Sequence, residues 1–149
     1  MNDSIKIIMN TTKYQAMMQY MHKIELIEPS VAKLNIELIA VEHSHKFNTY
    51  IEDRTICLNP TLFIDDKVTT PMLVFTICHE IGHYVLKHLT SDIDGTTDLV
   101  EQELEADAFA IKALDHLRIN RSCAVKMLTL LNVSYLERRI ENIKNLMIS

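Results

Sequence analysis

Two histidines, His79 and His83, stand four residues apart in the segment 74–88, and Glu80 directly follows the first of them. In an α-helix, residues at i and i+4 project from one face, so both imidazoles can coordinate a single zinc ion. Glu80 is turned about 100° from His79 by the 3.6-residue period, so it can reach a water on the metal without being a ligand. This arrangement predicts peptide hydrolysis without a covalent intermediate, with Glu80 as the general base.

The helix that carries this motif is apolar on nearly every side, which is typical of a buried helix. Two hydrogen-bonded core histidines are therefore an alternative to a metal site, since buried ring nitrogens need partners. Gly82 favours the metal site. The chain has only two glycines, and a glycine in mid-helix costs about 1 kcal/mol relative to alanine. Close approach of another backbone beside the metal would explain its presence.

A catalytic zinc site needs a third protein ligand and an open position. The segment 99–117 reads as a long helix whose apolar stripe includes Glu103, with Asp107 one turn later on the same side. The opposite face carries charged residues that we expect to be solvated: Glu101, Glu105 and Lys112. We expect Glu103 to be the third ligand and Asp107 to orient a ligand histidine. For either carboxylate, a structural salt bridge is the alternative.

Other residues are weaker candidates for binding the metal or for catalysis. His88 lies about 180° from His79 on the helical wheel, so we expect it to face away from the metal. Cys78 is turned about 100° from His79, which makes it a poor fourth ligand. His43 and His45 could bind metal, but solvent-facing histidines are commoner. Four residues are unranked candidates for stabilising an oxyanion: Tyr84, Tyr135, Arg138 and Arg139.

The elements that position these residues can be predicted from periodicity and stop signals. Residues 12–28 repeat apolar side chains at helical spacing until Pro29, and residues 34–42 indicate a strand. Two short strands meet near Asp53 and Arg54, and Thr70 and Pro71 open a helix to about residue 88. After the helix 99–117, two shorter helices follow at 122–131 and 134–147. The order of elements predicts one α+β domain spanning residues 1–149.

Composition sets limits on the function. The chain of 149 residues is 48% hydrophobic and 23% charged, with a net charge of -5 and no visible basic cluster, which argues against a nucleic-acid partner. The longest apolar run is far short of the roughly 18 residues that a membrane span needs, and no export signal is visible. Three unpaired cysteines (Cys57, Cys78 and Cys123) suit reduced thiols. We therefore expect a soluble, cytoplasmic protein with no membrane partner.

The motif "HEIGH" followed by "ELEADAFA" resembles the gluzincins, zinc peptidases that combine HExxH with a downstream glutamate. More narrowly, the chain is similar to the ImmA/IrrE family of small metallopeptidases, over most of residues 31–146. The resemblance implies a zincin-like minimal metallopeptidase domain with His79, His83 and Glu103 as ligands and Glu80 as the base. It departs from the family at "IKALDHLRI", where members often carry "LLMP", so the resemblance does not define the edge of the substrate cleft there.

We therefore expect an endopeptidase that holds one Zn²⁺ per chain and cleaves a protein or peptide substrate. Family members typically cleave a helix-turn-helix repressor, so the resemblance implies a transcriptional repressor as the target class. Two alternatives stay open. One is a noncatalytic binding module stapled by zinc, which the lack of an evident fourth ligand disfavours. The other is a soluble relative of the HtpX-like peptidases, which share the ligand pattern.

Overall fold

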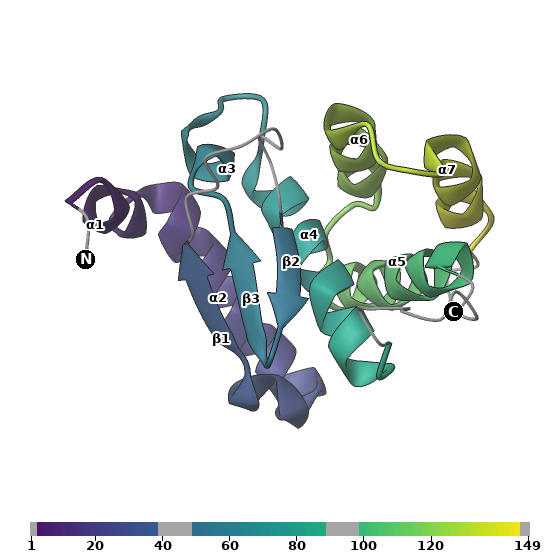
Figure 1. The fold of residues 1–149 in the computed structure, drawn as a ribbon, viewed down its shortest axis with the longest axis horizontal. Helices are drawn as coiled ribbons and strands as arrows, with labels where there is room; N and C mark the ends of the chain where they lie inside the picture. The colour runs from purple at the N-terminus through teal and green to yellow at the C-terminus, as the bar shows by residue number, and fades with distance from the viewer. Residues whose placement is uncertain (1–2, 39–48, 89–98, 147–149) are drawn as a thin grey trace.

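The computed structural model describes residues 3–38, 49–88 and 99–146, and in this part of the chain helices lie behind and beside one small sheet (Figure 1). This arrangement is the predicted α+β fold. In chain order the elements are α1 (Asp3–Met9), α2 (Thr12–Ile27), the 3₁₀ helix η1 (Pro29–Lys33), β1 (Asn35–Leu38), β2 (Thr49–Glu52), β3 (Thr55–Leu58), α3 (Thr61–Ile64), α4 (Thr70–Val85), α5 (Leu99–His116), α6 (Ser122–Leu131) and α7 (Leu136–Asn145).

The sheet has the order β1-β3-β2, with β1 parallel and β2 antiparallel to β3. Asp53 and Arg54 form the tight turn between β2 and β3, both with positive φ (46° and 63°), as a two-residue hairpin of the type I′ kind requires. The turn pairs Ile51 with Ile56, and both side chains are buried. Among the described strands, β2 therefore has a partner on only one side, and this edge adjoins α4.

Helix α2 covers the core with one face, as its periodicity predicts. Its buried residues, Tyr14, Met17, Met21 and Ile24, recur at helical spacing, and the Thr11 hydroxyl accepts a hydrogen bond from the Tyr14 N–H to cap the first turn. In Figure 1 the helix lies behind the sheet, and it contacts α4. Met17 and Met21 are thus part of the core packing.

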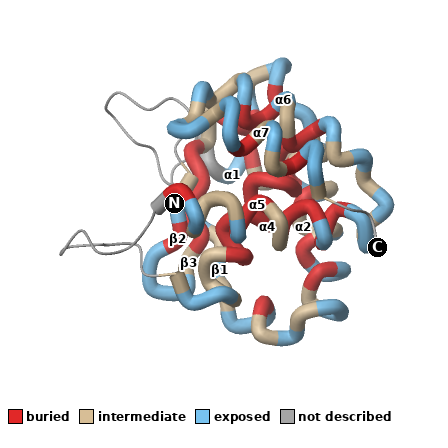
Figure 2. Tube along the Cα trace, turned by 90° about the vertical axis from the view of Figure 1, so that its right-hand side faces the viewer, coloured by how far each residue is buried: buried red, intermediate tan, exposed pale blue. Residues whose placement is uncertain are grey.

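Helix α4 is the central element, and it contacts α2, β2, α5 and α6. All its residues from Met72 to Gly82 are buried, which accounts for the continuous apolar sequence (Figure 2). The predicted cap at Thr70 is wrong by one position. Thr69 is the N-cap, because its hydroxyl accepts from the Met72 N–H at 3.3 Å, and Pro71 lies in the first turn where its missing N–H costs nothing.

Helix α4 ends at Val85, three residues earlier than predicted, because Lys87 adopts a left-handed conformation (φ 59°) and reverses the chain. The helix predicted at 134–147 is α7, which starts after another left-handed residue, Tyr135. The predicted strand 34–42 corresponds to β1, and its residues 39–42 lie outside the described residues. The short helices α1 and α3 were not predicted, because seven and four residues are too few to show a periodicity.

Helices α5, α6 and α7 form the second half of the molecule (Figure 1). Helix α5 runs alongside α4, and α7 in turn contacts α5 and α6. The small residues Ala106 and Ala110 of α5 are completely buried. The site described next lies between α4 and α5, with the edge strand β2 beside α4 and with α7 beside α5.

Candidate metal centre

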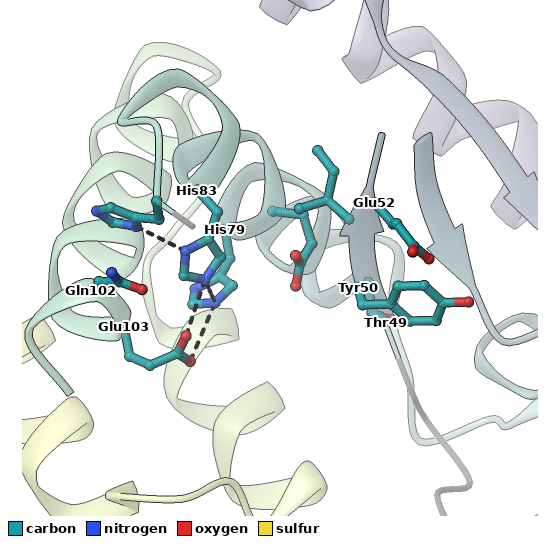
Figure 3. A pocket seen from close by; sticks show the side chains of 10 residues that line it. Thr49, Tyr50, Glu52, His79, His83, Gln102 and Glu103 are labelled. Atoms are coloured by element: carbon teal, nitrogen blue, oxygen red, sulfur yellow. Dashed lines mark hydrogen bonds and ion pairs between the residues drawn. The ribbon is translucent and has the colours of Figure 1, made fainter. Parts of the chain in front are cut away.

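The two histidines of α4 present their Nε2 atoms to the same point. His79 and His83 lie one helical turn apart, and their Nε2 atoms are 3.0 Å from each other. Glu103 comes from the neighbouring helix α5, with one carboxylate oxygen 3.0 Å from His83 Nε2 and the other 3.5 Å from His79 Nε2. Figure 3 shows the carboxylate pointing at both imidazoles. The structure therefore brings together all three residues predicted as ligands.

These separations suit a tetrahedral metal ion. Ligand atoms at about 2.0–2.1 Å from a tetrahedral zinc lie roughly 3.3 Å from one another. The two Nε2 atoms are 3.0 Å apart, and each lies close to a different oxygen of Glu103, His83 Nε2 at 3.0 Å and His79 Nε2 at 3.5 Å, which is near that value. Two imidazole nitrogens and one carboxylate oxygen are also the donor set of catalytic zinc sites. His79, His83 and Glu103 can accordingly hold a metal ion.

Gly82 determines how closely the two ligand-bearing helices approach. A Cβ atom at this position would lie 3.1 Å from Phe109 Cβ and 3.2 Å from both Ala106 Cα and the Ala106 carbonyl oxygen. Such distances are shorter than normal carbon contacts of about 3.5–4.0 Å. The backbone of α5 therefore packs against α4 at Gly82, as predicted, and Glu103 stands one turn before this contact.

Asp107 holds His79 from the side opposite Glu103. Its Oδ1 atom lies 2.8 Å from His79 Nδ1, and the Asp107 side chain is completely buried. When Nδ1 donates to this carboxylate, the lone pair of Nε2 is directed at Glu103 and His83. Asp107 thus has the contact predicted for a carboxylate that orients a ligand histidine.

Arg139 of α7, which the sequence analysis named only as an unranked candidate for stabilising an oxyanion, instead contacts the carboxylates of the site and does not line the cavity that holds Glu80. Its Nε donates to Asp107 Oδ2 at 2.8 Å and its Nη2 donates to Oδ1 at 2.9 Å, while Nη1 lies 3.0 Å from Glu103 Oε2. The predicted alternative for the carboxylates, an arginine salt bridge, is therefore present together with the histidine contacts. A signal existed in the sequence, because Arg139 shares the apolar stripe of α7 with Leu136 and Ile143.

The position of His88 contradicts the prediction that this residue faces away from the metal. It does not face away from the site, because the left-handed Lys87 folds the chain back after α4. His88 Nδ1 lies 2.9 Å from His83 Nδ1, and His88 Nε2 lies 3.3 Å from Glu105 Oε2. Helical-wheel geometry could not predict this contact, since it applies only while the helix continues. Glu105 is exposed, as predicted, and it pairs with this histidine.

Glu80 lies beside the histidines and opens onto the same cavity. The cavity has a volume of about 380 Å³ and is lined by Thr49, Tyr50, Ile51, Glu52, His79, Glu80, His83, His88, Gln102 and Glu103. Burial raises the pKa of Glu80 to about 7, against the opposing effect of the His79 charge. A carboxylate with this pKa can both accept and release a proton near neutral pH.

The charges around His79 favour a positive charge at this site. Burial lowers the pKa of His79, but hydrogen bonds to Asp107 and Glu103 outweigh it and raise the pKa to about 10. Burial likewise opposes ionisation of Glu103, yet its hydrogen bonds with His79 and His83 hold the pKa far below the usual range. An imidazolium satisfies both carboxylates through its two N–H groups. A metal ion on Nε2 would replace one of these protons.

The other candidates lie apart from this cluster. Tyr84 lines an adjoining hollow under the Asp53–Arg54 turn, whereas Arg138 forms an exposed ion pair with Glu101 and Tyr135 is half exposed. Neither Tyr135 nor Arg138 lines the cavity that holds Glu80. Cys78 is fully buried, and burial raises the pKa of its thiol. His43, His45 and the acidic residues of the segment 90–98 lie outside the described residues.

The fold and the site together define a metallopeptidase-like domain with a cluster that can hold a metal ion, His79, His83 and Glu103, on two neighbouring helices. The chain belongs to the family of IrrE N-terminal-like domains, Peptidase_M78, whose model matches residues 22–117. This finding confirms the family predicted from the motifs. The match includes α4 and α5 but ends before α6 and α7.

No curated protein matches the chain, and no solved structure matches it. In the part of the chain that the structure describes, no helix has both the length and the apolar character needed to traverse a bilayer.

Proposed function

We propose that the protein is a zinc-dependent endopeptidase in which His79, His83 and Glu103 hold the metal and Glu80 acts as the general base. One observation carries the proposal: the two imidazole Nε2 atoms and the Glu103 carboxylate converge, with one ligand atom per residue all within 4.8 Å of one another, and Glu80 opens onto the same cavity. Membership of a metallopeptidase family supports the same reaction class.

The side chains of the site have separate tasks in this reaction. Zinc, when bound, supplies the Lewis acidity that polarises a substrate carbonyl and acidifies a water molecule. Glu80 takes the proton of the attacking water and delivers it to the leaving amine, which suits its pKa of about 7. Asp107 keeps the Nδ1 proton of His79 in place, so that Nε2 is free to bind the metal.

The edge strand β2 supports a peptide substrate. Its residues Thr49, Tyr50, Ile51 and Glu52 line the cavity, and in Figure 3 the strand lies across from the histidines, with the side chains of Tyr50 and Glu52 pointing away from them. An extended peptide can add to a sheet edge through main-chain hydrogen bonds, whatever its side chains. A chain bound in this way would pass the metal ligands and Glu80. We therefore infer an extended, accessible segment of a protein as the substrate.

The number of ligands favours catalysis over the zinc-stapled binding module. Structural zinc sites are usually closed by four protein ligands, whereas catalytic sites keep one position open. Among the described residues, only His79, His83 and Glu103 form a cluster suited to a metal. The side of the cluster next to Glu80 borders the cavity, so this is the open position in our proposal.

The resemblance to the ImmA/IrrE family suggests the target class. We propose a regulatory protein, such as a helix-turn-helix repressor, as the substrate. The three buried, free cysteines (Cys57, Cys78 and Cys123) support a reducing compartment, and we propose the cytoplasm.

Comparison of two proteins that differ only at Glu80 tests the function. Parent and Glu80→Gln are each loaded with zinc and added to a cell extract, and mass spectrometry identifies new peptide termini. We expect termini that appear with the parent, disappear with a chelator and are missing with Glu80→Gln. A His79→Ala variant separates the alternative: a zinc staple predicts an unfolded domain for His79→Ala and no change for Glu80→Gln. Identical termini with parent and Glu80→Gln would rule out the proposed mechanism.

A further inference from the structure

Helix α7 reaches the metal site through a single buried side chain. Arg139 is only 5% exposed, and it lies outside the residues 22–117 that the family model matches. We propose that Arg139 is a positioning residue that fixes the third ligand Glu103 and, through Asp107, the first ligand His79. This inference rests on the proposed function, because it concerns the same metal site.

The contacts of the guanidinium group leave both carboxylates little freedom. Its Nε and Nη2 atoms bind both oxygens of Asp107, at 2.8 and 2.9 Å, so the plane of this carboxylate is fixed. The same Oδ1 atom meets His79 Nδ1 at 2.8 Å, which sets the rotation of the imidazole ring. The arginine therefore orients His79 mainly through Asp107, since its own nearest approach to the ring, from Nη2 to Nδ1, is 3.5 Å.

The third nitrogen of the group acts on Glu103. Nη1 lies 3.0 Å from Oε2, while the other oxygen, Oε1, lies 3.0 Å from His83 Nε2. A glutamate side chain has three rotatable bonds, and 30% of its surface is exposed here, so packing alone does not hold it. The contact with Arg139 selects the rotamer in which the carboxylate faces the two histidines.

The charges explain why an arginine is tolerated beside a cation site. Three carboxylates, from Glu80, Glu103 and Asp107, gather around His79. Arg139 is the one lysine or arginine for which the described residues show ion pairs with this group. A divalent ion and one guanidinium together balance three carboxylates. Arg139 thus neutralises the one carboxylate charge that a divalent ion would leave uncompensated.

Positioning and electrostatics predict opposite effects of removing Arg139. If the residue acted only through its charge, Arg139→Met would bind zinc more tightly, because a neighbouring positive charge is lost. Arg139→Lys would then resemble the parent. If the residue acts through its fork, both variants bind more weakly, since the single ammonium of lysine cannot hold Asp107 and Glu103 as the guanidinium does. Loss of such outer contacts typically costs about 10- to 100-fold in metal affinity.

Arg138 offers a matched control. It is the preceding residue of the same helix, but its side chain is 57% exposed and pairs with Glu101 at the surface. Arg138→Met and Arg138→Lys therefore make the same chemical changes away from the site, and we expect their zinc affinity to stay within about twofold of the parent.

The test measures zinc dissociation constants of the full-length variants by competition with a chromophoric chelator. Thermal unfolding after chelation checks that each variant folds, and the visible spectrum of the cobalt-loaded protein reports the geometry of the ligands. We expect Arg139→Lys and Arg139→Met to bind zinc about 10- to 100-fold more weakly, with an altered cobalt spectrum. If Arg139→Met does not fold, the zinc affinity and cobalt spectrum of Arg139→Lys alone decide between positioning and charge.

Two results would overturn the inference. One is an Arg139→Lys variant with the zinc affinity and cobalt spectrum of the parent. The other is a folded Arg139→Met variant that binds zinc more tightly. In both cases the parent binds zinc and the proposed function stands. A parent that binds no zinc overturns the proposed function and, with it, the role of Arg139.

Discussion

Replacing Gly82 by alanine tests whether close packing of α4 and α5 sets the metal site. By helix propensity alone, the exchange would stabilise the protein by about 1 kcal/mol. The structure predicts a cost instead, because the new Cβ would lie 3.1–3.2 Å from Phe109 Cβ and from the backbone of Ala106. Overpacking of this kind typically costs about 1–3 kcal/mol. We therefore expect a net loss of stability between zero and about 2 kcal/mol.

The strain cannot be relieved by a change of rotamer, since the contacts are to a Cβ atom and to backbone atoms. Helix α5 must move away by roughly the few tenths of an ångström that separate these contacts from normal ones. Glu103 lies one turn from Ala106, so the same movement shifts its carboxylate relative to His79 and His83. Zinc affinity should therefore fall together with stability.

Thermal unfolding and zinc titration of Gly82→Ala and Gly82→Val measure both effects. In a chain of this size, 1 kcal/mol corresponds to roughly 2–4 °C in Tm. We expect Tm to fall by up to about 8 °C for alanine and further for valine, which is larger, with zinc affinity declining in the same order. A Gly82→Ala protein with a raised Tm and the zinc affinity of the parent would refute the packing argument.

Three further predictions concern other parts of the site. Asp107→Asn should weaken zinc binding about 10- to 100-fold, measured by chelator competition, because the amide is a poorer acceptor for the His79 Nδ1 proton. His88→Ala should lower zinc affinity by less, and the conservative variant His88→Asn should restore part of it, since His88 contacts His83 at 2.9 Å. In protein kept free of metal by a chelator, the raised pKa of His79 (about 10, from an ordinary 6.5) stabilises the fold fully below about pH 6.5. This contribution should disappear as pH rises toward 10, by at most about 1.4 kcal/mol per pH unit, and the Tm of the metal-free protein measured against pH checks it. Zinc binding should strengthen over the same range because fewer protons compete, which zinc titration at each pH checks.

The cluster of His79, His83 and Glu103 could be predicted because its geometry is local. The spacing of His79 and His83 fixes their relation within one helix, and the apolar stripe of α5 identifies Glu103 as its inward glutamate. Gly82 similarly indicated a close helix contact, which the structure shows to be with Ala106. Each of these inferences uses the helical repeat, which applies as long as the helix is regular.

The contacts of His88 and Arg139 were not predicted, because they depend on geometry that helical periodicity does not describe. His88 returns to His83 because a single residue, Lys87, adopts positive φ, and the sequence has no glycine or asparagine there to signal it. Arg139 reaches Asp107 across 32 residues, so its role depends on how α7 packs on α5. Its place in an apolar stripe indicated burial but did not identify its partners.

The most direct test of the central claim is the ratio of hydrolysis rates of parent and Glu80→Gln on one cleaved peptide, at equal zinc occupancy. The proposed roles predict that both proteins bind one zinc ion and that the variant is slower by at least about 100-fold, because only the general base is lost. Equal rates at equal occupancy would contradict the role of Glu80, and a parent that binds no zinc would contradict the metal site itself.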